Sequence, residues 1–177
     1  FAPFRATSCF AVDRTGTTIK TGTGLTISQK NIVFTGKYIF VCNEVNNVLW
    51  RFPLTGGAGT GLSLPNTSAT WMLWTGTMIV VQRSVNNVQP TWFVDPESMV
   101  AAAIINLGIA GITSTQAAVY DGKNVWTGNS GSAPQKLIHA GALNVTDITI
   151  PNTLRLEFDG RYIWAGNGAG FVKLVKT

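Results

Sequence analysis

Short apolar segments alternate along the chain with turn-forming residues. In the segment 32–43, the apolar run Ile32–Phe34 is followed by Thr35–Gly36 and then by the second apolar run Tyr38–Cys42. Glycine accepts the positive φ of a tight hairpin turn without steric cost. The pattern therefore predicts a β-hairpin, with one apolar strand on each side of the turn.

The same hairpin pattern occurs four times, and its turn glycines lie 40, 46 and 38 residues apart. Self-similarity at such a period is typical of a protein built from stacked repeats. The four copies cover residues 32–43, 72–83, 118–129 and 156–167.

Two further segments accompany each hairpin. A short segment precedes it, at Gly24–Ile27, Gly61–Leu64, Gly111–Ser114 and Asp147–Ile150, and three of these four segments alternate apolar and hydroxyl residues. A third apolar segment follows it, at Val48–Phe52, Thr91–Val94, Gln135–Ile138 and Phe171–Val175. Four strands in about forty residues are typical of one β-propeller blade.

We therefore predict an all-β fold, a small β-propeller of about four four-stranded blades, as one domain over residues 1–177. The blades are expected at roughly 17–54, 55–97, 98–140 and 141–177. Residues 1–16 are expected to form an N-terminal arm, a closing strand or a decayed fifth hairpin around Val12–Gly16. For the apolar insertion Met99–Ala110, three alternatives stay open: a strand, a short helix or part of an interface. The alternative fold is a viral jelly roll or β-sandwich, which would not show four matched hairpins.

One position of the second hairpin strand carries a bulky apolar residue in every copy. A lone blade cannot cover both faces of its sheet, so stacked blades are expected to bury these side chains between them. The residues are Phe40, Val80, Trp126 and Trp164.

The two clearest copies, Asp121–Asn129 and Asp159–Asn167, combine Asp-Gly, Trp and Asn. In this they resemble the Asp-Gly-x-Ile-Trp-Val-x-Asn repeats of bacterial and phage-encoded propellers of the NHL and YncE-like kind. The copy around Gly76 departs from this pattern, with Thr-Gly for Asp-Gly, Val80 for Trp and Gln82 for Asn. The resemblance implies a propeller and favours a phage fibre, spike or virion protein.

Composition excludes several classes of protein. With 45% hydrophobic and 12% charged residues, the chain is not a disordered tail. The net charge is +5, but the basic residues are scattered, so we expect no nucleic-acid partner. The longest apolar run, Met99–Ile105, is far shorter than the ~20 residues of a membrane span, and no signal peptide is visible.

Few residues offer chemistry. His139 is the single histidine, and no Gly-x-Ser-x-Gly elbow presents a nucleophile, so we expect no catalytic residue and no enzyme activity. Asp121 and Asp159 are expected to cap their turns. Cys9 and Cys42 lack the spacing of a zinc site, so we expect no metal, and we also expect no cofactor. For the two cysteines, a disulfide and two buried thiols both stay open.

The amide residues near the end of each second hairpin strand are the candidate ligand-binding residues: Asn43, Gln82, Asn129 and Asn167. Amide side chains suit neutral polar ligands such as sugars, although each could instead only close its own turn.

The expected function is a non-enzymatic recognition module, extracellular or on a virion surface. It would bind a host-surface receptor or glycan through one propeller face. The alternative is a structural virion or assembly component, with other virion proteins as partners. Because four blades make a very small propeller, the alternative to a single-chain ring is a homo-oligomer in which several copies of the chain complete a larger one.

Overall fold

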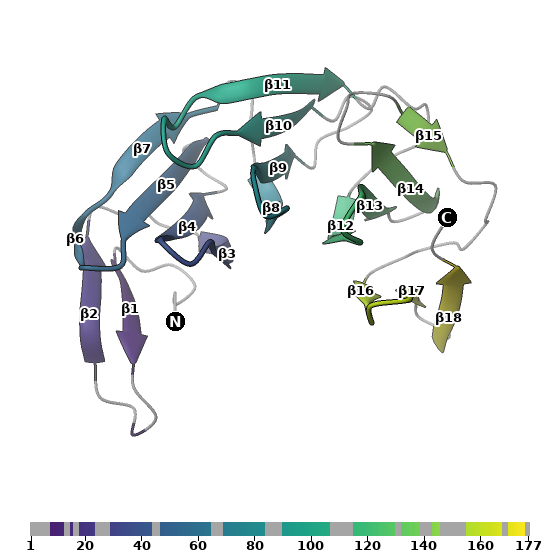
Figure 1. Ribbon diagram of the computed structural model, residues 1–177, viewed down its shortest axis with the longest axis horizontal. Helices are drawn as coiled ribbons and strands as arrows, with labels where there is room; N and C mark the ends of the chain where they lie inside the picture. Colours follow the sequence, from purple (N-terminus) through teal and green to yellow (C-terminus); the bar gives the residue numbers. More distant parts are fainter. Residues whose placement is uncertain are drawn as a thin grey trace.

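The computed structural model describes residues 8–12, 15, 18–23, 29–43, 47–64, 69–83, 90–106, 115–129, 132–138, 143–145, 155–167 and 170–175. In this part of the chain every regular element is a β-strand, and the strands form five sheets, here called A to E. The sheets follow one another around an open arc in chain order (Figure 1). An all-β fold of small propeller type is thereby confirmed.

Sheets B, C and D each have four strands, and neighbouring strands run antiparallel. Sheet B has the order β3 (Gln29–Phe34), β4 (Tyr38–Asn43), β5 (Val48–Pro53), β7 (Thr60–Ser63). Sheet C consists of β8 (Ala69–Trp74), β9 (Ile79–Arg83), β10 (Pro90–Val94) and β11 (Ala101–Asn106). Sheet D consists of β12 (Thr115–Tyr120), β13 (Asn124–Asn129), β14 (Ser132–Ile138) and β15 (Leu143–Val145).

The sheets at the two ends of the arc are smaller in the described structure. Sheet E has three strands: β16 (Arg155–Phe158), β17 (Tyr162–Asn167) and β18 (Gly170–Val175). Sheet A is a hairpin of β1 (Ser8–Val12) and β2 (Thr18–Thr23), to which the short β6 (Gly57–Ala58) adds in parallel. Of the three expectations for residues 1–16, a fifth hairpin is the one that agrees with this arrangement.

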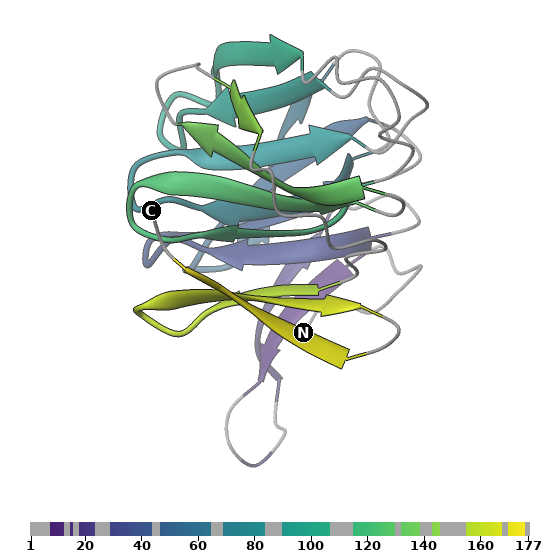
Figure 2. The same ribbon diagram turned by 90° about the vertical axis from the view of Figure 1, so that its right-hand side faces the viewer.

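In sheets B to E, the first strand of each hairpin lies on the inner side of the arc (Figure 1). These inner strands contact one another in the order β3, β8, β12, β16. Seen from the side, the sheets form successive layers (Figure 2). This radial succession of sheets differs from the two face-to-face sheets of the alternative sandwich fold.

The expected blade limits differ from the sheets. Gly61–Leu64 was expected to open the blade of the following hairpin, but β7 pairs with β5 of the preceding hairpin, with Val48 opposite Ser63 and Arg51 opposite Thr60. That assignment is wrong, because an alternating apolar segment has the same pattern whether it is the first strand of a sheet or the last. The apolar segment that begins at Met99 likewise contributes β11, the outer strand of sheet C. The other preceding segments, Gly24–Ile27, Gly111–Ser114 and Asp147–Ile150, lie outside the described residues.

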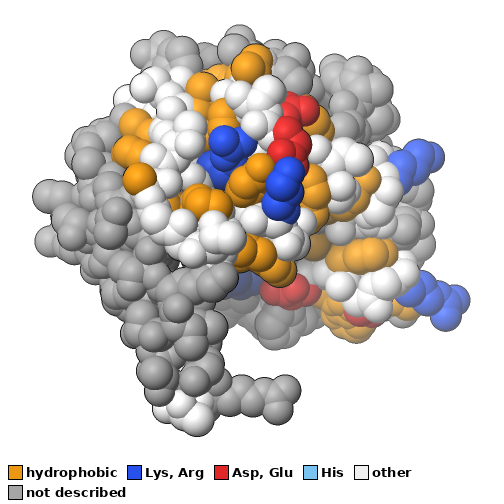
Figure 3. Space-filling view, turned by 60° about the vertical axis from the view of Figure 1, so that its left-hand side comes forward, with side chains coloured by type: hydrophobic (Ala, Val, Ile, Leu, Met, Phe, Trp, Pro, Cys, Tyr) orange, Lys and Arg blue, Asp and Glu red, His pale blue; other side chains and the backbone are white. Residues whose placement is uncertain are grey.

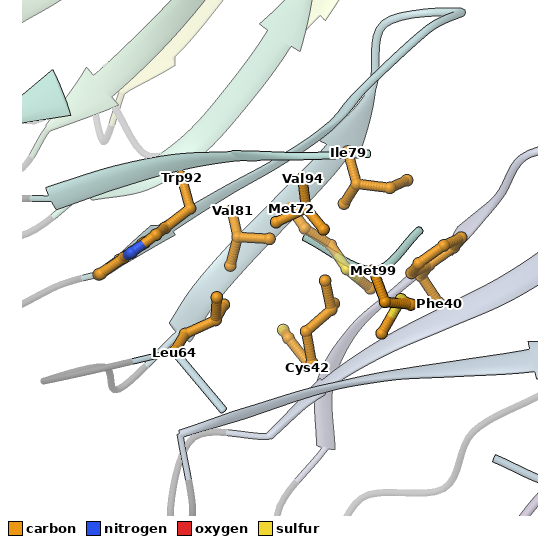
Figure 4. Close-up of a cluster of buried hydrophobic side chains, with 10 residues drawn as sticks. Phe40, Cys42, Leu64, Met72, Ile79, Val81, Trp92, Val94 and Met99 are labelled. Carbon is orange, nitrogen blue, oxygen red and sulfur yellow. The ribbon is translucent and has the colours of Figure 1, made fainter. Parts of the chain in front are cut away.

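The core consists of apolar clusters between successive sheets. Figure 4 shows the cluster between sheets B and C, where Phe40 and Cys42 of β4 meet Met72, Ile79 and Val81 of sheet C. Val80 and Trp126 are also buried between sheets, as expected from their place in the repeat. The fourth residue of this set, Trp164, is only half-buried, because no described sheet follows sheet E around the arc.

Candidate functional site

The turn of the sheet D hairpin is held by the carboxylate of Asp121. Its Oδ1 accepts the backbone N–H groups of Lys123 and Asn124 at 2.8 and 2.7 Å. Its Oδ2 accepts the indole N–H of Trp126 at 2.8 Å and the Asn124 amide at 3.3 Å. Gly122, with φ of 93°, completes the turn. The carboxylate therefore serves the hairpin, as the sequence predicts.

The other hairpins repeat this arrangement with small changes. Asp159 accepts the backbone N–H groups of Arg161 and Tyr162, and its Oδ2 accepts the Trp164 indole at 2.7 Å. In sheet C, the hydroxyl of Thr75 accepts the backbone N–H of Met78 at 3.0 Å. In sheet B, Thr35 does the same for Tyr38 at 3.1 Å. Threonine thus replaces aspartate at the turn but offers no second oxygen to an indole.

Three carboxylates have a pKa below the ordinary value of their residue type. Burial raises the pKa of Asp121, but the hydrogen bonds from Trp126 and the backbone outweigh it and leave the pKa lowered. Backbone N–H groups of Ser98 and Glu97 lower the pKa of Asp95. The Lys37 ammonium and the Tyr38 hydroxyl lower the pKa of Glu97. All three side chains are ionised at neutral pH, which does not suit the role of a general acid.

The amide residues of the sequence prediction lie where their strands end. Asn43, Asn129 and Asn167 are the last residues of β4, β13 and β17. Each of these strands begins at its hairpin turn, so each asparagine stands at the edge of its sheet opposite that turn. The side chains of these three asparagines lie outside the described part of the structure.

Gln82, the fourth candidate, has a different environment. It is the next-to-last residue of β9, and its side chain is fully buried. A ligand at the surface does not reach it, so we remove Gln82 from the candidate contacts. The register explains the burial: Gln82 lies opposite Trp71 and Thr91, which are also buried, in the middle of sheet C.

Sequence reasoning missed a cluster on the face that carries the hairpin turns. Glu97, in the loop between β10 and β11, accepts the Lys37 ammonium at 2.7 Å and the Tyr38 hydroxyl at 2.9 Å. The Arg51 guanidinium lies 4.7 Å from the centre of the Tyr38 ring and donates to the Pro96 carbonyl at 2.9 Å. The lysine and arginine side chains stand beside the acidic ones, among hydrophobic groups (Figure 3).

This cluster joins sheets B and C through charged groups at the surface. Lys37 and Glu97 are separated by sixty positions in the chain, so no local sequence motif predicts the pair. Asp95 and Glu97 do not act together: Asp95 caps its own loop by accepting the N–H groups of Glu97 and Ser98, both at 2.8 Å. The side chains are 64% and 57% exposed for Lys37 and Glu97, and such surface pairs add little stability.

Other residues singled out in the sequence lie outside the described part. His139 belongs to this group, and so does the side chain of Cys9, whereas Cys42 is buried in the core. The two alternatives for these cysteines, a disulfide and two buried thiols, therefore both stay open. Among the described residues, no three His, Cys, Asp or Glu side chains gather as metal ligands do, and no helix has the length and apolarity to cross a membrane.

Comparison with known proteins bears on the fold. No protein-family model matches the chain, and no curated protein sequence matches it. Among solved structures, the chain is similar to the computationally designed Ika4 protein, with a TM-score of 0.70 at 11% identity over 85% of this chain and 92% of that one. It is also similar to the Pan2 WD40 domain of Neurospora crassa, with a TM-score of 0.73 at 10% identity over 94% of this chain and 55% of that one.

The Dos1 propeller is a third similar structure, with a TM-score of 0.70 at 8% identity over 91% of this chain and 48% of that one. The chain thus spans about half the length of the Pan2 domain and of the Dos1 propeller. Identities this low bear on the fold alone, because one fold hosts many functions. Together with the radial succession of sheets, they show that the chain has a β-propeller fold.

Proposed function

We propose that this protein is a non-enzymatic recognition module on a virion or cell surface. In this proposal it binds a host-surface receptor or glycan through the propeller face at which the second hairpin strands end. The observation that carries the proposal is the placement of Asn43, Asn129 and Asn167 at the same end of equivalent strands. Amide groups at these ends offer hydrogen-bond donors and acceptors together, which suits the hydroxyl groups of a sugar.

The use of the carboxylates supports a binding role over catalysis. Asp121 and Asp159 accept three or more hydrogen bonds within their own hairpins. Glu97 is paired with Lys37 and Tyr38. An ionised carboxylate carries no proton to donate as a general acid, and the hydrogen bonds that these three groups accept hold turns and loops in place.

A glycan array and a host-cell binding assay test the proposal. The Asn129→Ala/Asn167→Ala double variant is expected to lose binding while keeping the wild-type thermal unfolding. Lys123→Gln/Arg161→Gln is the matched control, because both residues are exposed at the turns of the same two hairpins, on the opposite face. Binding that is lost in the control and kept in the asparagine variant would contradict the proposal.

The second candidate function is a structural component of a virion or another assembly. One observation favours it: Ile32 and Phe34 of β3 are 43% and 60% exposed. Large apolar side chains exposed next to each other on a strand are a common feature of protein contact surfaces. Under this function the propeller is a scaffold, and its partners are other proteins of the assembly.

A further inference from the structure

Each inner hairpin of the arc packs in two directions. One set of its side chains faces the preceding sheet, and the other set faces the following sheet. In sheet D, Ala118, Tyr120 and Val125 pack against Val80 and other residues of sheet C. In the same sheet, Val119 and Trp126 pack against sheet E. We call these two sets the back face and the front face of a hairpin.

The repeat carries the same faces from sheet to sheet. The back faces are Ile32, Phe34 and Ile39 in sheet B; Met72, Trp74 and Ile79 in sheet C; Ala118, Tyr120 and Val125 in sheet D; Leu156, Phe158 and Ile163 in sheet E. The front faces are Val33 and Phe40; Leu73 and Val80; Val119 and Trp126; Glu157 and Trp164. Three front faces meet three back faces within the chain, between B and C, C and D, and D and E.

In sheet B, part of the back face is exposed in the described structure: Ile39 packs with Val41 and Phe52, but Ile32 and Phe34 are uncovered. Met72 and Leu156, the equivalents of Ile32, are 3% and 5% exposed because the preceding sheet covers them. Ile32 itself is 43% exposed, and Phe34 is 60% exposed. Sheet A precedes sheet B, but β1 and β2 lie at the outer side of the arc, whereas β3 lies at the inner side (Figure 1). In the described structure, no strand of sheet A covers the inner part of this face.

One front face remains open as well, in sheet E. Trp126 is 1% exposed because Leu156, Ile163 and Ala165 of sheet E cover it. Trp164 occupies the same repeat position and is only half-buried, and its neighbour Glu157 is exposed. The strands of sheet E begin at the inner side of the arc, where sheet A has none (Figure 1). The exposed part of the sheet B back face and the front face of sheet E both lie toward the inner side of the arc, so their positions are complementary.

We propose that two copies of this chain close a ring head to tail, with the front face of sheet E of one copy on the back face of sheet B of the other. Trp164 of one copy then covers Ile32 and Phe34 of its partner, as Trp126 covers Leu156 and Ile163 within the chain. A two-fold ring forms this contact twice and leaves neither face open.

Glu157 sets the strength of this contact. The other front faces have Val33, Leu73 and Val119 at its position. A carboxylate in an apolar contact is costly to desolvate, so the natural contact is weak and reversible. Glu157→Val is expected to lower the dissociation constant of the dimer by about tenfold or more.

Sedimentation of the intact chain at micromolar concentrations tests the ring. The expected mass is twice 18.9 kDa at the higher concentrations. Phe34→Asp and Trp164→Ala are each expected to shift the mass to that of one chain. Val100→Asp is the matched control, because Val100 is 59% exposed but lies in the loop before β11, away from both faces, and the dimer should persist. Circular dichroism checks that every variant remains folded.

Mixing the two variants separates a head-to-tail contact from other dimers. The Phe34→Asp copy keeps its front face, and the Trp164→Ala copy keeps its back face, so an equimolar mixture is expected to form dimers again through one intact contact. A dimer that is lost in Phe34→Asp but unaffected by Trp164→Ala would indicate back-to-back pairing and overturn the proposal. A wild-type mass of one chain at every concentration, or of three chains or more, would also overturn it.

Discussion

The indole N–H of Trp126 donates to Asp121 Oδ2 across the sheet D hairpin, five residues apart in the chain and 2.8 Å in space. Trp164 and Asp159 repeat the bond in sheet E at 2.7 Å. In both hairpins the bond joins the side chain that caps the turn to a tryptophan of the second strand. In sheet D, where Trp126 packs on sheet E, the tight turn and a contact between sheets thus depend on one carboxylate.

Asp121→Ala is expected to lower the free energy of unfolding by about 3 kcal/mol, because it leaves the buried indole N–H and two backbone N–H groups without their acceptor. Asp159→Ala should cost about 1 kcal/mol, since Asp159 is exposed and water replaces its hydrogen bonds. Urea denaturation measures both values. Equal losses for the two variants would contradict the role assigned to burial.

Stability is expected to fall in acid. The pKa of Asp121 in the folded chain is below its ordinary value, so its carboxylate stabilises the fold fully above about pH 5 and loses this contribution as the pH falls through the folded pKa. Asp95 and Glu97 are shifted in the same direction. Thermal unfolding followed from neutral pH to about pH 2 should show this decline, and Asp121→Asn should make it less steep. A variant whose stability falls with pH as steeply as that of the wild type would refute the assignment.

Gly160→Ala is expected to destabilise the chain by about 1 kcal/mol, because φ at this turn position is 94° and an L side chain is strained there. A Cβ at Gly160 would meet no atom within 4 Å, so the whole cost is backbone strain and none of it is a clash. Gly160→Asn is the matched variant, and it should cost less because asparagine tolerates positive φ better than alanine. Chemical denaturation of the two variants gives the comparison, and an alanine variant as stable as the wild type would contradict the turn geometry.

The sequence predicts the hairpins well because their signals are local. Asp-Gly or Thr-Gly marks each turn within a few residues of the strands it joins, and the four hairpins form where the pattern repeats. The packing positions Phe40, Val80 and Trp126 follow from the same repeat. The capping role of Asp121 and Asp159 was also predictable, because the residue type and its place before glycine determine it.

The features that the sequence does not predict depend on contacts between residues that are far apart in the chain. The strand Thr60–Ser63 has the same pattern in either neighbouring sheet, and only its register with β5 assigns it to sheet B. The contact of Lys37 with Glu97 joins two loops of different blades. Gln82 stands one residue before the repeat position of Asn43, Asn129 and Asn167, which Arg83 occupies, and buried residues surround it in sheet C.

The turn at Thr75 shows what a self-contained hairpin allows. Its hydroxyl caps Met78 without an aspartate at the turn and with Val80 at the position of Trp126, and the strands on either side still form. Each hairpin therefore contains the residues that form its own turn. Repeated hairpins can diverge in sequence while the fold is retained. Divergence of this kind would hide ancestry from sequence comparison long before it altered the shape of the molecule.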